Sequence, residues 1–158
     1  MAEIKIRPAR ADEGVALTAL SMRSKQSNGY DDAFMAACRE ELTISADQIR
    51  TNEYWVAEAG EICGCASLTV DAAAGTGEVH SFFVEPSLKG SGIGRKLWQK
   101  LHERAQAQGL KALVLDADPN AVPFYESMGF VKIGESPSGS IEGRFIPHMK
   151  LDLKDAAA

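Results

Sequence analysis

VEPSLKGSGIGRKLWQKL, residues 84–101, joins a strand pattern to a helical pattern through three glycines. The strand pattern ends at Pro86, the glycines alternate with other residues within KGSGIG, residues 89–94, and apolar residues then recur at helical spacing from Ile93. The free amides and the dipole at the start of a helix attract anions, and small residues let the backbone approach them closely. A need for positive φ would account for one such glycine, whereas three ahead of a helix favour an anion-binding loop.

The spacing of this loop excludes two common phosphate motifs. A P-loop would need lysine and then a hydroxyl residue after its last glycine, but Arg95, Lys96 and Leu97 follow Gly94. The dinucleotide fingerprint would need a further glycine at position 95. Lys89, with Arg95 and Lys96, still surrounds the loop with positive charge, which indicates a phosphate-bearing ligand of another class.

Composition is that of an ordinary globular protein. The 158 residues are 45% hydrophobic and 25% charged, which predicts a single domain over residues 1–153 and a disordered tail over 154–158. The net charge of -5 argues against a nucleic acid partner, and no apolar run is long enough for a membrane span or a signal peptide. We therefore expect a cytoplasmic protein that binds a small cationic or neutral molecule.

The three cysteines form no metal-binding pattern. Cys63 and Cys65 lie two residues apart in one strand pattern, and Cys38 stands alone, so no second pair completes a set of ligands. We expect buried, reduced thiols and no metal.

Hydrophobic periodicity and turn signals predict seven strands and five helices. The helices are expected at 12–26, at 31–41, after the capping box of residues 45–48, from the glycine loop to a cap at Gly109, and from Asp118-Pro119 to Gly129. The strands are expected at 3–8, 53–59, 62–70, 78–84, 112–117, 130–135 and 144–153, the last of them an edge strand because it contains Pro147.

The order of these elements predicts the topology. Gly60-Glu61 is a two-residue hairpin signal, so the strands at 53–59, 62–70 and 78–84 should form an antiparallel meander. The glycine-loop helix and the continuous apolar run at 112–117 complete a βαβ unit, which requires a right-handed crossover and a parallel pair. We expect an α/β (α+β) domain with a mixed, mostly antiparallel sheet of about seven strands and a central parallel pair, flanked by helices.

Three motifs resemble those of the GNAT superfamily of acyl-coenzyme-A-dependent N-acyltransferases. KGSGIG, residues 89–94, is similar to the family's loop [RQ]-x-x-G-x-[GA], with lysine in the first place. FFVEP, residues 82–86, resembles the strand end L-x-V-x-P. DPNAVPFYESMGF, residues 118–130, resembles the family's capped helix with its tyrosine and its G-F ending. The resemblance spans about residues 1–153 and implies one acetyltransferase domain.

The resemblance implies acetyl-CoA as co-substrate and a primary amine of a small molecule or peptide as acceptor, in a monomer or homodimer without nucleic acid or membrane partners. The amine is expected to attack the thioester directly in a ternary complex and to release CoA. A non-catalytic CoA-binding sensor or partner-binding module on the same fold is the alternative. The contacts implied for the co-substrate are made by the strand end, the loop and the later helix start: Phe82, Phe83, Val84, Lys89, Gly90, Ser91, Gly92, Ile93, Gly94, Arg95 and Asn120.

Amide formation needs a group that accepts the proton of the amine and a group that donates one to the departing thiolate. By resemblance Tyr125 is the donor, and a packed aromatic residue is the other reading of this position. Glu78 and His80 are two residues apart, hence on one face of a strand, at positions where family members carry a catalytic Glu or His. A solvated strand end and a hydrogen-bonded imidazole are equally compatible with the sequence.

Acceptor selectivity in the family comes largely from the first helices and from the loop between the last two strands. In these segments Tyr30, Asp31 and Asp32 could meet a cationic amine, and Arg144 and His148 could meet a carboxylate. A solvated helix start and an ordinary edge strand would explain the same residues.

Overall fold

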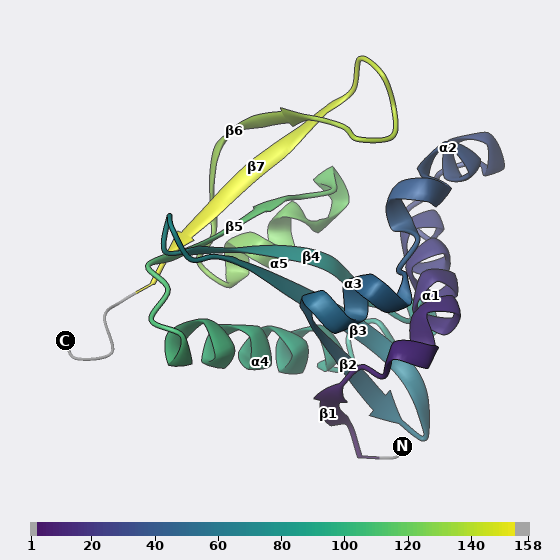
Figure 1. The fold of residues 1–158 in the computed structure, drawn as a ribbon. Coiled ribbons are helices and arrows are strands. Elements are labelled where there is room, and N and C mark those ends of the chain that lie inside the picture. The colour runs from purple at the N-terminus through teal and green to yellow at the C-terminus, as the bar shows by residue number, and fades with distance from the viewer. Residues whose placement is uncertain (1–2, 154–158) are drawn as a thin grey trace.

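The structure is a computed structural model and describes residues 3–153 (Figure 1). In this range the strands are β1 (Lys5–Pro8), β2 (Glu53–Ala59), β3 (Glu61–Asp71), β4 (Thr76–Val84), β5 (Ala112–Asp116), β6 (Val131–Pro137) and β7 (Phe145–Asp152). The α-helices are α1 (Gly14–Gln26), α2 (Asp32–Leu42), α3 (Ala46–Thr51), α4 (Ile93–Ala107) and α5 (Val122–Ser127), and short 3-10 helices η1 (Ala11–Glu13), η2 (Pro86–Leu88) and η3 (Pro119–Ala121) join them. None of these helices is long and apolar enough to cross a membrane.

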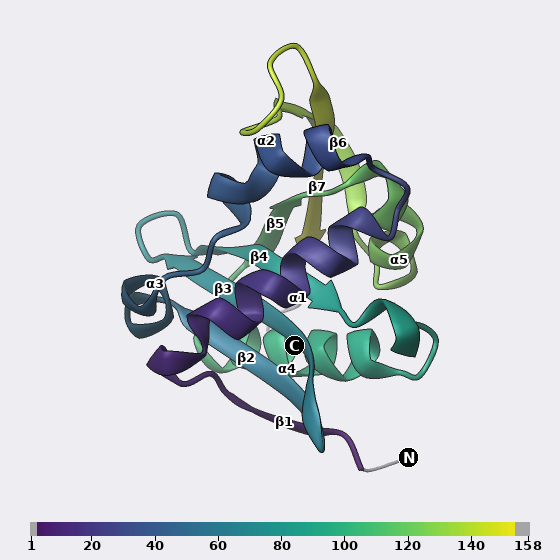
Figure 2. The same ribbon diagram turned by 90° about the vertical axis from the view of Figure 1, so that its right-hand side faces the viewer.

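The seven described strands form one sheet in the order β1-β2-β3-β4-β5-β7-β6. Neighbouring strands are antiparallel except β4 and β5, which are parallel. The connecting helix α4 lies on one face of the sheet, and α1 lies on the other (Figures 1 and 2). The predicted meander, the central parallel pair and the fold class are confirmed.

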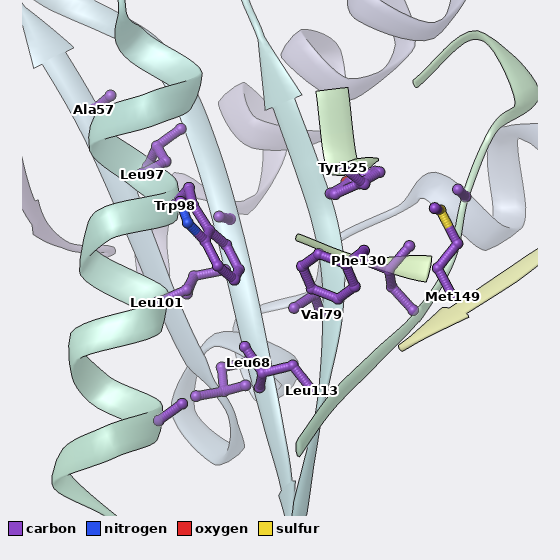
Figure 3. Close-up of a cluster of buried hydrophobic side chains, with 14 of the residues drawn as sticks. Ala57, Leu68, Val79, Leu97, Trp98, Leu101, Leu113, Tyr125, Phe130 and Met149 are labelled. Atoms are coloured by element: carbon purple, nitrogen blue, oxygen red, sulfur yellow. The ribbon is translucent and has the colours of Figure 1, made fainter. Parts of the chain in front are cut away.

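A separate hydrophobic cluster attaches the helices to each face of the sheet. Leu97 and Leu101 of α4, four residues apart, point into the larger cluster (Figure 3). Leu113 of β5 and Phe130, which directly precedes β6, belong to the same cluster. The smaller cluster holds α1 against the opposite face and includes Leu17. The three cysteines are free and buried, as expected.

Two helices begin later than predicted because 3-10 turns precede them. The Glu13 carboxylate accepts a hydrogen bond from the Arg10 amide at 2.7 Å, and this local bond accompanies a tight turn, so α1 begins at Gly14. Asp118 accepts from a nearby amide in the same way and caps η3, so α5 begins only at Val122.

The hairpin between β2 and β3 is tighter than its two-residue signal predicts. Gly60 alone separates the strands, at φ 83°, because Glu61 already pairs in β3. The register of the two strands shifts between Ala57 and Glu58. This irregularity compensates for a turn that is one residue shorter than predicted.

The prediction that Pro147 marks an edge strand is wrong, since β7 lies between β5 and β6. The Pro147 carbonyl accepts a hydrogen bond from the Ala117 amide at 2.8 Å, one residue beyond the end of β5 at Asp116. A proline is tolerated here because the ladder between β5 and β7 has already ended and needs no donor from it.

Arg7 of β1 is held between two carboxylates. Its guanidinium donates to both Glu13 oxygens, at 2.9 and 2.7 Å, and to Glu58 at 3.0 Å. Glu13 is only 8% exposed. The hydrogen bonds from Arg7 lower the pKa of Glu13 from 4.5 to about 2.

We expect the free energy of unfolding to fall as the pH drops from 4.5 toward about 2, because Glu13 then stays ionised in the folded protein while it becomes protonated in the unfolded chain. The contribution of Glu13 to the free energy of unfolding is fully present above pH 4.5 and is on the order of 3 kcal/mol. Urea unfolding near pH 7 and near pH 3 measures it. Glu13→Gln should be less stable near pH 7 and should lose less between the two conditions, whereas the exposed control Glu61→Gln should follow the parent. An equal loss in Glu13→Gln and the parent would contradict this assignment.

Candidate active site

β4 and β5 separate after three paired residues. Within the described range their pairing ends at Glu78, opposite Val114. The Glu85 amide donates to the Cys63 carbonyl of β3 at 2.8 Å, so the preceding amide, that of Val84, is directed toward the edge that β5 leaves open. This is the strand end at which the family resemblance implies contacts to the co-substrate, through Phe82, Phe83 and Val84.

A bulge in β4 accompanies the separation. Ser81 and Phe82 of β4 stand opposite the single Ala66 of β3, and Ser81 has a φ of 50°. The Cys65 thiol donates to the Ser81 carbonyl at 3.2 Å and so fixes the bulged residue. Because a bulge bends its strand, it helps to separate the end of β4 from β5. The bulge was not predictable from the sequence, since the alternating pattern carries no signal for positive φ at a serine.

The glycines of the loop serve two different purposes. Gly90 and Gly92 have φ of 85° and 86°, a conformation that favours glycine. Gly94 lies inside α4 with an ordinary φ, but a Cβ there would lie 3.2 Å from the ring of Phe124. The first two glycines therefore allow the backbone to turn into α4, and the third lets α4 pack closely against α5.

The glycine loop and the first turn of α4 contain several backbone amides that have no hydrogen-bond acceptor among the described residues. The Ser91 amide donates to the Leu88 carbonyl at 3.2 Å, and the Lys89 ammonium donates to the Ser27 hydroxyl at 3.0 Å. Free N–H groups at a helix start attract an anion, so this loop is chemically suited to phosphate. The amides without an acceptor among the described residues are those of Gly90, Gly92, Ile93, Gly94 and Arg95.

Tyr125 of α5 is packed in the larger cluster and lines a cavity. Its ring centroid lies 5.7 Å from that of Phe130 and 6.0 Å from that of Phe82, and the residue is 7% exposed. The hydroxyl has no hydrogen-bond partner in the described range and is not among the fully enclosed polar atoms, so it opens to the cavity. Burial, with a smaller effect of Asp118, raises the pKa of Tyr125 above its usual value, and the hydroxyl keeps its proton at neutral pH.

Glu78 and His80 lie together where β5 leaves β4. His80 Nε2 is 3.2 Å from Glu78 Oε1, and the side chains are 46% and 42% exposed. Val79, between them, is buried in the larger cluster, so both side chains share the opposite, open face of the strand as predicted.

A polar network joins four separate segments at another wall of the cavity. The Tyr30 hydroxyl donates to Asp118 Oδ2 at 2.8 Å and accepts from Arg144 at 2.8 Å. Lys25 Nζ lies 3.5 Å from the same Asp118 oxygen, and the Asn120 side-chain amide donates to the other one at 2.8 Å. Burial alone would raise the pKa of Asp118, but these hydrogen bonds and the charge of Lys25 lower it, so the carboxylate stays ionised.

Three residues considered for acceptor binding have other partners. Asp31 caps α2 by accepting from an amide of that helix, and Asp32 accepts from Gln26 at 2.7 Å. His148 does not act with Arg144, because its Nδ1 lies 2.7 Å from Asp116 Oδ1. Asp31 and Asp32 therefore belong to a helix start, which was the alternative to acceptor binding for these residues.

One cavity of about 770 Å³ connects these features. Its walls come from the end of α1, from α2, β4, the glycine loop, the start of α5 and the β6–β7 loop, and Figure 2 shows α2 close to that last loop. Asp116 also lines the cavity and was not among the predicted residues, although a carboxylate at the end of a buried strand is a signal in the sequence. Apart from Ser91, all residues predicted for catalysis and co-substrate binding line the cavity: Glu78, His80, Phe82, Phe83, Val84, Lys89, Gly90, Gly92, Ile93, Gly94, Arg95, Asn120 and Tyr125.

Among residues 3–153, no group of three or more His, Cys, Asp or Glu side chains is arranged to hold a metal ion.

Residues 12–153 match the family described as acetyltransferase (GNAT) domain. The chain therefore belongs to the GNAT acetyltransferase family, and the resemblance seen in its motifs is confirmed.

Named relatives and solved structures agree with this membership. The chain is 32% identical to the peptidyl-lysine N-acetyltransferase YjaB of Salmonella typhimurium over 84% of its own length and 87% of that protein. It is 35% identical to an IAA acetyltransferase of Azospirillum brasilense over 78 residues, 48% of this chain, and spans about half (51%) of that relative. The PaiA N-acetyltransferase of Thermoplasma acidophilum, solved in complex with coenzyme A, has the same fold, with a TM-score of 0.78 over 96% of this chain and 99% of that one at 17% identity.

Proposed function

We propose that this protein transfers an acetyl group from acetyl-CoA to a primary amine by direct attack in a ternary complex. One arrangement carries the proposal: a single cavity contains the unpaired amides of the loop that starts α4, the open edge of β4 and the free hydroxyl of Tyr125. These three features would bind the phosphates, the extended arm and the sulfur of a phosphate-bearing thioester, respectively. The coenzyme A and the lysine acceptor named for two relatives support the same assignment.

The chain's own groups would hold the co-substrate at both ends. The amides of Gly92 and Ile93 at the start of α4 would bind pyrophosphate oxygens, with Lys89 and Arg95 adding positive charge. The Val84 amide on the open edge of β4 would bind the extended arm as a neighbouring strand would. Acetyl-CoA supplies the activated acetyl group, a thioester.

Proton transfers would then be divided between two walls of the cavity. Glu78 or His80 accepts a proton from the amine, directly or through water, and leaves a neutral nitrogen. As the nitrogen–carbon bond forms and the carbon–sulfur bond breaks, the Tyr125 hydroxyl donates its proton to the leaving sulfur, and the proton that the new amide nitrogen loses returns to Tyr125 through water. Each wall therefore provides one half of the acid–base chemistry.

Thiol release with a panel of primary amines tests the proposal. Acetyl-CoA should release free thiol faster with at least one amine than with buffer alone, and the product should be the N-acetylated amine by mass spectrometry. Binding of acetyl-CoA without amine-dependent thiol release would instead support the non-catalytic sensor or partner-binding module.

Gly92→Val should lower the affinity for acetyl-CoA about ten-fold or more, because a β-branched side chain would stand among the amides that bind phosphate. Gly109→Val is a matched control: both glycines have positive φ and free space around a Cβ, but Gly109 follows the far end of α4. Calorimetry on both variants separates backbone strain, which they share, from blocked binding. Unchanged affinity in Gly92→Val would remove the loop from the site. Gly94 is the poorer choice, since a side chain there would disturb the contact with Phe124.

A further inference from the structure

A second carboxylate–imidazole pair, outside the roles assigned so far, has its carboxylate in the wall of the cavity. His148 Nδ1 lies 2.7 Å from Asp116 Oδ1, and the two residues are direct partners in the ladder between β7 and β5. The Asp116 side chain is 38% exposed and lines the cavity, and that of His148 is 32% exposed. The imidazole fixes one oxygen of the carboxylate and leaves the other for a ligand.

The pair Glu78–His80 lies on β4, and the pair Asp116–His148 lies on β5 and β7. Glu78 is the last β4 residue that pairs with β5, and its partner there is Val114. His80 lies two residues beyond Glu78, and Asp116 lies two residues beyond Val114. The side chains of these four residues therefore share one face of the sheet. The pair Glu78–His80 and the pair Asp116–His148 therefore flank the place where β4 and β5 diverge.

This end of the cavity carries negative charge that no lysine or arginine neutralises. Within the described range, the only ion-pair partners of Glu78 and Asp116 are the two histidines. Lys150 is on the same face but pairs with Asp152 at 3.4 Å.

The cationic side chains of the cavity are engaged elsewhere. Lys25 and Arg144 share Asp118 in the polar network, and Lys89 and Arg95 stand at the glycine loop. The cavity is thus cationic at the phosphate end and anionic at the end where β4 and β5 diverge.

The unpaired hydroxyl of Tyr125 independently marks this cavity as a ligand site. The residue is 7% exposed, its hydroxyl is without a partner in the described range, and it opens to the same space as the two pairs. A substrate bound in the cavity would supply the hydrogen-bond partner that this hydroxyl lacks among the described residues.

We propose that the acceptor is a primary amine with a second positive charge, a diamine in class, and that Asp116, oriented by His148, binds the second charge. The inference rests on the proposed acetyl transfer. The reacting nitrogen must be neutral to attack, so it gives up its attraction to the carboxylates before the reaction. A second ammonium keeps its charge throughout and therefore stays bound to Asp116, while Glu78 and His80 serve the reacting nitrogen.

Three acceptors of one chain length test the proposal: 1,4-diaminobutane, 1-aminobutane and 4-aminobutanoate. They offer a cation, a methyl group or a carboxylate at the end that does not react. We expect kcat/KM for the diamine to exceed that for 1-aminobutane by about ten-fold or more, as one charged hydrogen bond predicts, with 4-aminobutanoate the poorest. A parent enzyme that prefers either of the other two would overturn the inference.

Variants of the pair separate specificity from folding. Asp116→Asn should raise KM for the diamine about ten-fold while KM for acetyl-CoA and kcat change little, and should abolish the preference over 1-aminobutane. His148→Gln, which keeps a hydrogen-bond donor, should retain more of the preference than His148→Ala. Asp47→Asn is the matched control, because Asp47 is exposed, lies outside the cavity and should leave all parameters unchanged.

The outcomes distinguish this inference from the function on which it rests. A parent protein that binds acetyl-CoA but acetylates no amine refutes the proposed function. A parent that acetylates the diamine, with Asp116→Asn keeping the same preference and the same acetyl-CoA affinity, refutes only the role of Asp116.

Discussion

Tyr125→Phe is expected to lower kcat by on the order of 10- to 10³-fold while KM for acetyl-CoA changes little. The substitution keeps the ring that packs between Phe82 and Phe130 and removes only the hydroxyl. In the proposed mechanism that hydroxyl interacts more strongly with the departing thiolate than with the bound thioester, so its loss should affect the transition state. Turnover measured per folded molecule, with thermal unfolding of the same preparation, is the test.

Tyr54→Phe is the matched control for this experiment. Tyr54 is also 7% exposed, but it belongs to the smaller cluster and lies outside the cavity. We expect it to leave kcat unchanged. Full turnover in Tyr125→Phe would remove Tyr125 from the chemistry and leave it a packed aromatic residue.

The double replacement Glu78→Gln with His80→Ala should lower kcat/KM by ~10² or more and flatten the acidic limb of its pH profile. The two side chains are in contact at 3.2 Å, so either one can take over part of the role of the other in a single variant. The double variant avoids this compensation. The measurement is a pH profile of kcat/KM for the amine at saturating acetyl-CoA.

The single variants then assign the base. The replacement that lowers kcat/KM further on its own identifies the residue that contributes more to accepting the proton. Glu135→Gln, which removes a carboxylate paired with Lys132 outside the cavity, should behave like the parent. Activity of the double variant within a few fold of the parent, with the same limb, would mean that another group or the solvent deprotonates the amine.

Much of the fold follows from patterns within short stretches of sequence. Alternation and turn residues predicted the antiparallel β2-β3-β4 meander, and the glycine loop followed by a buried apolar run predicted the parallel pairing of β4 with β5. These signals are local, because the residues that carry them are neighbours along the chain. The same is true of Glu78 and His80, whose spacing of two was enough to place them on one face.

Features that depend on pairing between distant segments were not predictable in this way. The bulge at Ser81 exists because β3 and β4 differ by one residue in their ladder, and the place of β7 depends on which strand β5 accepts as a second neighbour. The bond between Asp116 and His148 follows from that same register, 32 residues apart. No periodicity within a single strand contains this information.

The place of β7 inside the sheet also affects how the protein folds while the ribosome is still synthesising it. Synthesis delivers β6 before β7, yet β7 must insert between β6 and β5, so β5 has an unpaired edge until the residues up to Asp152 are available. β5 carries the buried Leu113 and Leu115, and an open edge beside such residues is prone to pair with other chains. A nascent chain paused before β7 should therefore be the species most in need of a chaperone.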